Sequence, residues 1–410
     1  MTTQSVDLRP GPADRLSPGS GRSRSEILSV IAADARRRRD EGGGEPPLAA
    51  LELLREERIG AVRVPVELGG AGYSLRDLFD LIIDLAEADP DVPHILRVHF
   101  AFVEELFRVP TTEKKQRWLG EVLAGSLFGG ANSELSSRAV GKYEFDTTLT
   151  PDGDGYRLNG TKFYSTGTVF SDYVRVTAGV PDGTVLSAVV PTRREGVEHL
   201  DDWDGIGQRH TGSGTTVFTD VRVAEDETFP FRLAGDTLRA RQSFPQLVLH
   251  AVAAGILRSV ATDAAELVRS RRRSFAFATV SEPRHDPQLL EIIGSLTATA
   301  FAAESIVRAA AEAQDEATAA ARTTGIDPAL EARASILAAK AKVAIEEPAL
   351  RAASRLFDVG GASATRQSAH LDRHWRNLRT LFAHNPTAYK ARVLGDLFVN
   401  DTPLPDTGFF

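Results

Sequence analysis

The sequence predicts an α+β fold in which a helical domain, a β-domain and a helical bundle follow one another, and two changes of pattern carry this prediction. Apolar residues recur at helical spacing up to about residue 126 and again from about residue 236. Between these points polar and apolar residues alternate, and turn sequences such as PDGDG and NG follow at short intervals. We therefore expect domains at 25–126, 127–235 and 236–410 after a disordered tail at 1–24.

The composition is that of an ordinary soluble globular protein. Hydrophobic residues make up 42% of the 410 positions and charged residues 25%, which suits two or three domains or subdomains. The net charge of -8 argues against nucleic-acid and anionic-membrane partners, because both select a basic surface. The absence of cysteine removes disulfides, thiolate metal sites and cysteine nucleophiles.

No segment of the sequence indicates export or membrane insertion. The first 25 residues contain no apolar stretch of the kind found in a secretory signal. No uninterrupted apolar run approaches the roughly 18 residues that a membrane-spanning helix needs. We expect a cytoplasmic protein without a membrane partner.

The N-terminal part of the chain predicts several helices. Residues 1–24 are rich in Pro, Gly, Ser and Arg, which is typical of a disordered tail. Ser25 is the expected N-cap of the first helix, and the following arginine run at 36–39 suits a solvated helix C-terminus. After the breaking sequence EGGGEPP, helical patterns resume in four segments: 47–58, 74–88, 91–107 and 112–124.

The middle part of the chain predicts strands, whereas the C-terminal part predicts long helices. Residues 127–235 predict an antiparallel barrel or sandwich, because their turns are too short to hold crossover helices. Beyond residue 236 the alanine-rich segments 247–273, 287–321 and 327–356 have few helix breakers. Long helices of this kind predict an antiparallel four-helix bundle.

Common cofactor and metal motifs are absent. The G-x-G of GIGQRHTGSG lies in the β-region without a βαβ unit around it, so it is no dinucleotide fingerprint. His370 and His374 are four residues apart and share a helix face, but a metal pair there would need more ligands. We expect no metal.

Five strings in order resemble the acyl-CoA dehydrogenase superfamily over nearly all of residues 25–400. They are EKKQRWLGEVLAGSLFGGANSELSS, YRLNGTKFYSTGTVFSDYV, RHTGSGTTVFTDVRV, RSRRRSFAF and LFDVGGASATRQSAHLDRHWRNLRT. The last resembles the family's Gly-Gly loop and Arg-Asp helix, with Asn377 in place of that Asp. The resemblance implies a flavin bound between the β-domain and the helices, in a homotetramer whose neighbouring subunits share the site.

The sequence departs from the dehydrogenases at the catalytic base. A dehydrogenase of this family removes an α-proton with a carboxylate in one of two positions. About nine residues beyond Arg376 this chain has His384 and Asn385, and in the first bundle helix it has Gln246. A general base must reach the proton before its pKa matters, so ordinary dehydrogenation is doubtful.

The strings GTKFYSTGT, DWDGIGQRHTGSGT and LDRHWRNLRT…HNP resemble one branch of this superfamily more closely. This branch holds the two-component flavin monooxygenases, such as the dibenzothiophene monooxygenases and the amino-sugar N-oxygenases. The resemblance implies reduced FMN or reduced FAD from a separate NAD(P)H:flavin reductase, and O2 as co-substrate. It further implies a C4a-hydroperoxyflavin that passes one oxygen atom to nitrogen, sulfur or aromatic carbon of a small substrate.

The resemblance places three catalytic candidates around the flavin. Ser165 matches a flavin-contacting strand residue, although it could equally bond its own backbone. His99 matches the branch histidine beside the flavin and is preferred to His94, although either could be a core histidine. His384 lies beside the dehydrogenase base position, where an imidazole can exchange protons near neutral pH; the alternative is a helix cap before Pro386.

The same resemblance implies a wider set of cofactor-binding residues. Trp203 would flank the ring or cover the pocket, Ser213 would bond phosphate, and one arginine of 269–273, with Arg273 preferred, would pair with phosphate. Backbone close to the cofactor is expected at the two glycines of the Gly-Gly loop. The complete set is Asn132, Ser133, Ser165, Thr166, Trp203, Ser213, Arg273, Gly360, Gly361, His384 and Asn385.

Two other functions stay open at this point. A dehydrogenase with its base in an unusual place would hold FAD tightly and be reduced by an acyl thioester. A scaffold without activity would keep the tetramer and lose flavin affinity. The sequence does not decide the substrate.

Overall fold

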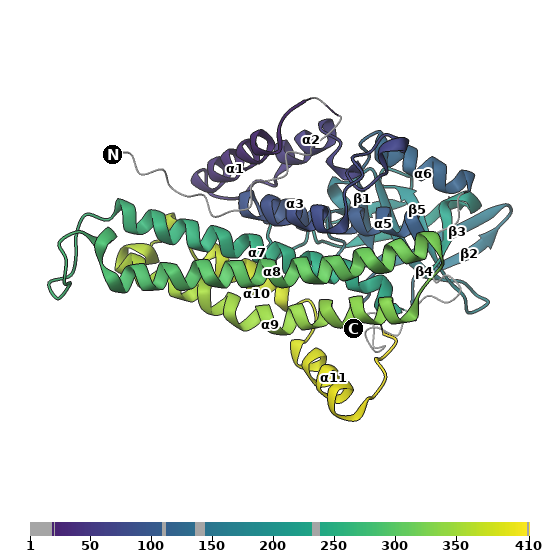
Figure 1. The fold of residues 1–410 in the computed structure, drawn as a ribbon. Coiled ribbons are helices and arrows are strands. Elements are labelled where there is room, and N and C mark those ends of the chain that lie inside the picture. The colour runs from purple at the N-terminus through teal and green to yellow at the C-terminus, as the bar shows by residue number, and fades with distance from the viewer. Residues whose placement is uncertain (1–18, 20, 109–111, 136–143, 232–237, 408–409) are drawn as a thin grey trace.

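The computed structural model describes residues 19, 21–108, 112–135, 144–231, 238–407 and 410. Figure 1 shows long bundle helices along one side of the molecule, with the shorter N-terminal helices and the sheet packed against them. The expected tail at 1–24 lies mostly outside the described residues. The domain boundaries stay predictions, because the largest apolar core runs continuously from the N-terminal helices into the bundle.

The N-terminal part forms six α-helices, close to the segments expected. The first begins at Arg24, so the expectation of Ser25 as its N-cap is wrong. Ser23 is the N-cap, because its hydroxyl accepts from the Glu26 backbone while the Glu26 carboxylate accepts from the Ser23 N–H. The helices are α1 (Arg24–Asp40), α2 (Leu48–Glu56), α3 (Leu75–Ala88), α4 (Asp91–Ile95), α5 (Arg97–Arg108) and α6 (Glu113–Leu123).

The central sheet is mixed, so the expectation of a purely antiparallel β-domain is wrong. Strand β4 runs parallel to β1 on one side and meets the end of β2 in parallel register. Short turns fix only the neighbouring hairpins, whereas β1 reaches β4 through a long excursion that the turn pattern does not reveal. The strands are β1 (Phe128–Ala131), β2 (Thr148–Asp152), β3 (Gly155–Lys162), β4 (Tyr173–Gly179), β5 (Val185–Pro191), β6 (Val197–His199), β7 (Thr216–Ala224) and β8 (Thr228–Pro230).

Three long helices and two shorter ones complete the described chain. Helices α7, α8 and α9 lie side by side, and α10 and α11 pack on α9 (Figure 1). Helix α3 lies along α7 and α8, so the bundle gains a helix from the N-terminal part. The helices are α7 (Leu238–Ser270), α8 (Pro287–Thr323), α9 (Pro328–Gly360), α10 (Arg373–Phe382) and α11 (Thr387–Asn400).

In the described part of the chain, seven short 3-10 helices occur between these elements. They are η1 (Ile59–Ala61), η2 (Val66–Leu68), η3 (Thr168–Phe170), η4 (Glu225–Glu227), η5 (Pro283–His285), η6 (Gly361–Thr365) and η7 (Gln367–Ala369).

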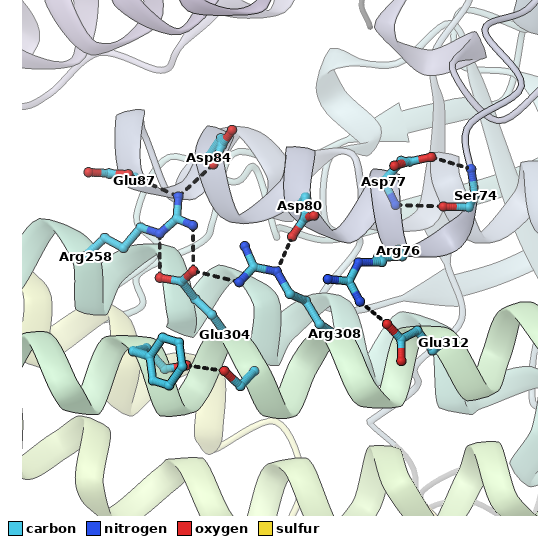
Figure 2. A network of polar contacts seen from close by, with 12 residues as sticks. Ser74, Arg76, Asp77, Asp80, Asp84, Glu87, Arg258, Glu304, Arg308 and Glu312 are labelled. Carbon is cyan, nitrogen blue, oxygen red and sulfur yellow. Dashed lines mark hydrogen bonds and ion pairs between the residues drawn. The ribbon is translucent and has the colours of Figure 1, made fainter. Parts of the chain in front are cut away.

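Charged side chains join α3 to α7 and α8 (Figure 2). Arg258 of α7 donates to both oxygens of Glu304 on α8 at 2.6 and 2.7 Å, and to Asp84 of α3 at 2.7 Å. One turn along α8, Arg308 donates to Asp80 at 2.6 Å. Burial alone would lower the pKa of Arg258, but Glu304 and Asp84 raise it. This cation therefore keeps its charge inside the three-helix contact.

Among the described residues, two helices are long and apolar enough to span a bilayer by length and composition alone. They are Gln242–Ser270 and Pro287–Thr323. The most apolar stretch of the first is 78% buried against other helices and that of the second 28%. One or two such helices are weak evidence, since core helices of soluble proteins have the same composition.

The network in Figure 2 predicts a large stability effect at Arg258. Arg258→Met should lower the free energy of unfolding by about 3 kcal/mol, because Glu304 loses its main partner at a buried position. Urea denaturation followed by circular dichroism measures this. Arg351→Met is the matched control, since Arg351 makes only an exposed pair with Glu347 and should change stability by less than about 0.5 kcal/mol. Equal effects would contradict the structural role.

Candidate active site

The end of β3 turns two hydroxyl side chains into the protein. Tyr164 has a left-handed backbone with φ 57, which interrupts the alternation of the strand. Ser165 and Thr166, next in the chain, are both buried. The Ser165 N–H donates to the Gly214 carbonyl at 3.0 Å, so this segment is held against the loop before β7.

The Ser165 hydroxyl is buried and has no hydrogen-bond partner among the described residues. Leaving a buried hydroxyl unsatisfied costs about 1–3 kcal/mol, so such groups normally have a reason. A flat heteroaromatic ligand with donors and acceptors on its edge would satisfy it. The hydroxyl therefore fits a flavin in this position. The alternative, a bond to its own backbone, is not present.

A chain of hydrogen bonds runs from Thr166 to the loop before β7. The Ser213 hydroxyl lies between those of Thr166 and Thr211, at 2.8 and 2.7 Å. The Gln208 carbonyl accepts from Thr211 and from the Trp203 indole, each at 2.9 Å. Ser213 is thus an internal connector in this chain of hydrogen bonds, and its contact with phosphate stays a prediction.

Gln208 links this chain to the N-terminal helices. Its side-chain oxygen accepts from His94 Nδ1 of α4 at 2.7 Å, and its N–H donates to the Asn377 side chain of α10 at 2.8 Å. Burial first, and then Arg97, lower the pKa of His94 to about 3. His94 is therefore neutral at neutral pH, with its proton on Nδ1 and a lone pair on Nε2.

His384 lies two residues beyond the end of α10 and contacts Arg97 at the start of α5. Arg97 Nη1 and His384 Nε2 are 3.1 Å apart. Because a guanidinium only donates, Nε2 accepts, and His384 is neutral with its proton on Nδ1. Although the residue is exposed in the single chain, surrounding protein atoms and basic neighbours, Arg97 first, lower its pKa well below the ordinary value.

The two positions at which a dehydrogenase keeps its carboxylate base meet in space. Asn385 Nδ2, from the segment after α10, lies 3.4 Å from Gln246 Oε1 of α7. Both residues are buried, and the Asn385 side-chain oxygen has no partner in the described part of the chain. Two amides therefore stand where proton abstraction would need a carboxylate.

Comparison with known proteins decides the family. Profiles of the acyl-CoA dehydrogenase N-terminal and C-terminal domains match residues 25–126 and 247–388. The dibenzothiophene monooxygenase of Mycolicibacterium goodii is 31% identical over 384 residues, which cover 90% of this chain and 91% of the relative. The chain belongs to the acyl-CoA dehydrogenase family.

Two further relatives place the chain among the flavin-dependent monooxygenases of this family. The probable FMNH2-dependent monooxygenase SfnC of Pseudomonas putida is 28% identical, over 93% of this chain and 95% of the relative. The structure of TdsC from Paenibacillus sp. A11-2 with FMN and indole superposes with a TM-score of 0.86 at 28% identity, covering 94% of this chain and 98% of that one. The expectation of a flavin-dependent monooxygenase is confirmed.

Within this family fold, the structure places His94 rather than His99 beside the other candidates. His99 Nε2 donates to the Gly60 carbonyl at 3.0 Å, and its ring packs against Phe128 with centroids 5.8 Å apart. No contact among the described residues joins His99 to Ser165 or His384. The preference for His99 over His94 is therefore not supported by the geometry, and His99 lies in the core.

Asn132 and Ser133 follow β1 and lie beside the segment that leads from β3 to Ser165. The Ser133 carbonyl accepts from the Phe163 N–H at 2.9 Å, two residues before Ser165. The Asn132 side-chain oxygen accepts from Thr177 at 2.7 Å. Both residues are exposed in the single chain. Their position suits contact with a ligand at Ser165.

Within a single chain, the residues around Ser165 do not include Arg273, Gly360 or Gly361. The connection after α7 and the end of α9 lie at the end of the bundle away from the sheet (Figure 1). Arg271 is the arginine that reaches the Gly-Gly loop, since it donates to the Val359 carbonyl at 3.1 Å. Arg273 is exposed and offers only its carbonyl to Arg271. A phosphate role at this end requires another subunit.

The histidines at 370 and 374 have different surroundings. Within the described residues there is no cluster of three or more metal-ligating side chains. His374 is buried and its Nε2 lies 2.7 Å from Asp263, which also pairs with Arg373. Burial lowers the pKa of His374 to about 4.

Sequence reasoning missed Arg97 and Gln208. Arg97 stands in a helix where an arginine usually signals only a solvated face. Gln208 lies within the quoted string GIGQRHTGSG, yet no pattern distinguishes a buried amide there from an exposed one. Asn377 was noted as a departure from the family, and its bond to Gln208 gives that departure a structural role.

The core position of His99 predicts a pH effect on stability. Burial lowers the pKa of His99 to about 4 from 6.5, so the unfolded chain takes up one more proton than the folded chain between these pH values. Stability should therefore fall as the pH falls from 6.5 to 4. His99→Gln should reduce the slope of unfolding free energy against pH by about 1.2 kcal/mol per pH unit near pH 5.

Urea denaturation at several pH values measures this slope. His285→Gln is the matched control, because His285 is exposed after α7. An unchanged slope in His99→Gln would show that His99 is not a buried neutral histidine.

Proposed function

We propose that this chain is the oxygenase of a two-component system. It takes reduced FMN from a separate reductase and transfers one atom of O2 to nitrogen, sulfur or aromatic carbon of a small organic substrate. The observation that supports this proposal is the contact between Asn385 and Gln246, which places amides at both positions where the family has its catalytic base. The printed names of SfnC and TdsC support FMN as the cofactor rather than FAD.

The residues around Ser165 have clear tasks in this function. When bound, reduced flavin supplies two electrons and the site of O2 activation; one oxygen atom enters the substrate and the other leaves as water. The Ser165 hydroxyl would hold the ring edge, with Thr166 and Ser213 fixing its segment. Trp203 and Tyr164 meet edge to face at 6.2 Å and would keep water away.

His384 and His94 would form hydrogen bonds to the cofactor or the substrate. His384 is neutral with its proton on Nδ1, so that atom can donate a hydrogen bond while Arg97 still donates to Nε2. His94 offers a lone pair on Nε2 while Gln208 holds Nδ1. The pair thus combines one donor and one acceptor from α4 and the end of α10.

The remote position of Arg273 and the Gly-Gly loop supports a homotetramer in which a neighbouring subunit completes the cofactor site. A cytoplasmic location would suit this function, since reduced flavin must pass between two proteins. The displaced-base dehydrogenase is disfavoured by the paired amides. The inactive scaffold is excluded by membership among the flavin-dependent monooxygenases.

Reconstitution tests the proposed function. The chain is mixed with a flavin reductase, NADH, FMN and 18O2, and with a panel of thioethers, amines and aromatic compounds. Mass spectrometry should find one 18O atom in a product that requires both the chain and reduced FMN. Reduction of bound flavin by an acyl thioester without O2, and no oxygenated product, would instead establish a dehydrogenase.

Ser165→Ala should divert the reaction from oxygen transfer to release of hydrogen peroxide. Without the hydroxyl, product per reduced flavin should fall roughly tenfold, equivalent to about 1.4 kcal/mol, and hydrogen peroxide should rise in compensation. Product and peroxide are measured in the same reaction. Ser305→Ala is the control, because that hydroxyl bonds only the Phe301 carbonyl of its own helix. Unchanged product would remove Ser165 from the site.

A further inference from the structure

Basic side chains gather around His384. The four largest charge effects that lower the pKa of His384 come from Arg97, His94, Lys342 and His250. Arg97 and Lys342 are the cations among them, because burial keeps His94 and His250 neutral at neutral pH. These five residues come from α4, α5, α7, α9 and the segment after α10. We call them the basic cluster.

Among the cations of the basic cluster, Arg97 is the most accessible to a ligand. Its Nη1 donates to His384, and its buried Nε has no partner in the described part of the chain. Burial is the one cause of its lowered pKa, so among the described residues no carboxylate offsets the charge of its guanidinium. The fork of an arginine normally holds a carboxylate or another oxyanion by two hydrogen bonds. Arg97 keeps donors available for such a group.

Lys342 and His250 extend the cluster around the Phe382 ring. Lys342 is 1% exposed, donates to the Phe382 carbonyl at 2.8 Å and lies 5.4 Å from the ring centroid. His250 stacks on the same ring with centroids 6.2 Å apart, and neither of its ring nitrogens has a partner in the described residues. Glu346, whose charge raises the pKa of Lys342, is already bonded to Thr387 and Arg379.

Burying positive charge without a counter-ion is costly. A buried cation loses its hydration and recovers that loss only from an anion or from hydrogen-bond acceptors. The response is visible in the pKa values: burial lowers the pKa of Lys342 to about 8 and that of Arg97 to about 10. In contrast, Arg258 in the structural network has two carboxylates of its own. A buried cation without a carboxylate partner of its own, beside a catalytic site, is a candidate anion-binding site.

We propose that the substrate carries an oxyanion group, a carboxylate or a sulfonate, that binds to Arg97 within the field of Lys342. This proposal rests on the proposed function, because it places the oxidised atom of that anion beside His384 and Ser165. For a thioether, the sulfur gains one oxygen atom from O2 to become a sulfoxide. Reduced FMN supplies the two electrons, and the second oxygen atom leaves as water.

Matched substrates that differ only in charge test the proposal. They are (methylthio)acetate, (methylthio)methanesulfonate and the neutral (methylthio)acetamide, each oxidised at the same thioether sulfur. In the wild type, kcat/KM should be at least tenfold higher for one or both anions than for the amide. The two anions decide between carboxylate and sulfonate. Equal or higher kcat/KM for the amide would overturn the proposal.

Substitution of Arg97 tests the residue. Arg97→Met should reduce the preference for the anion at least tenfold, and Arg97→Lys should retain part of it because the charge remains. Arg392→Met is the matched control, since Arg392 is exposed on α11 and stacks on Tyr389. Titration calorimetry with FMN and with the same anions gives a readout that needs no turnover.

The possible results distinguish failure of the oxyanion proposal from failure of the proposed function. Weaker FMN binding in Arg97→Met with an unchanged preference for the anion would assign the cluster to the cofactor and overturn the proposal. Oxygenation of the neutral panel alone would overturn it while leaving the monooxygenase in place. No oxygenated product from any compound, charged or neutral, would overturn the proposed function itself.

Discussion

The contact that joins α3 to α7 and α8 is the constraint on which the rest of the structure depends. Arg258 reaches carboxylates on both neighbouring helices and so fixes α3 along the bundle (Figure 2). Because α4 begins three residues after α3 ends, the position of His94 follows directly. The His94–Gln208 and Arg97–His384 contacts can form only if the N-terminal helices and the bundle keep this register. The site is therefore built between parts of the chain that are distant in sequence.

The chemistry of the site is set by what stands at the two base positions. In this family fold the segment after α10 and the first turns of α7 approach each other, as Asn385 and Gln246 show. A carboxylate at either place would remove a proton from carbon. An amide cannot, but it can hold a substrate or cofactor edge by hydrogen bonds. The fold thus preserves the geometry of a dehydrogenase while the side chains exclude its reaction.

The order of the helical and β-regions could be predicted from sequence because short strings carry it, and the same strings led to the prediction of Ser165 and His384 as site residues. The choice between His94 and His99 could not. On one continuous helix, residues five apart point about 140° from each other, and neither direction is known in advance. The break between α4 and α5 at Leu96 changes that relation further. The parallel strand pairs and the buried Arg97 also depend on long-range packing, which local periodicity does not contain.

The Arg97–His384 contact changes the role that the C-terminal histidine can have. An isolated imidazole would be charged or neutral near pH 6.5, which suits either donation or acceptance. Here the guanidinium occupies Nε2, so the ring is neutral and only Nδ1 carries a proton. The basic neighbours oppose a second proton and hold the pKa of His384 low. A neutral imidazole holds its last proton too tightly to give it up near neutral pH, so the ring acts through its Nδ1–H as a hydrogen-bond donor. The Arg97–His384 contact therefore sets both the protonation state and the donor atom of His384.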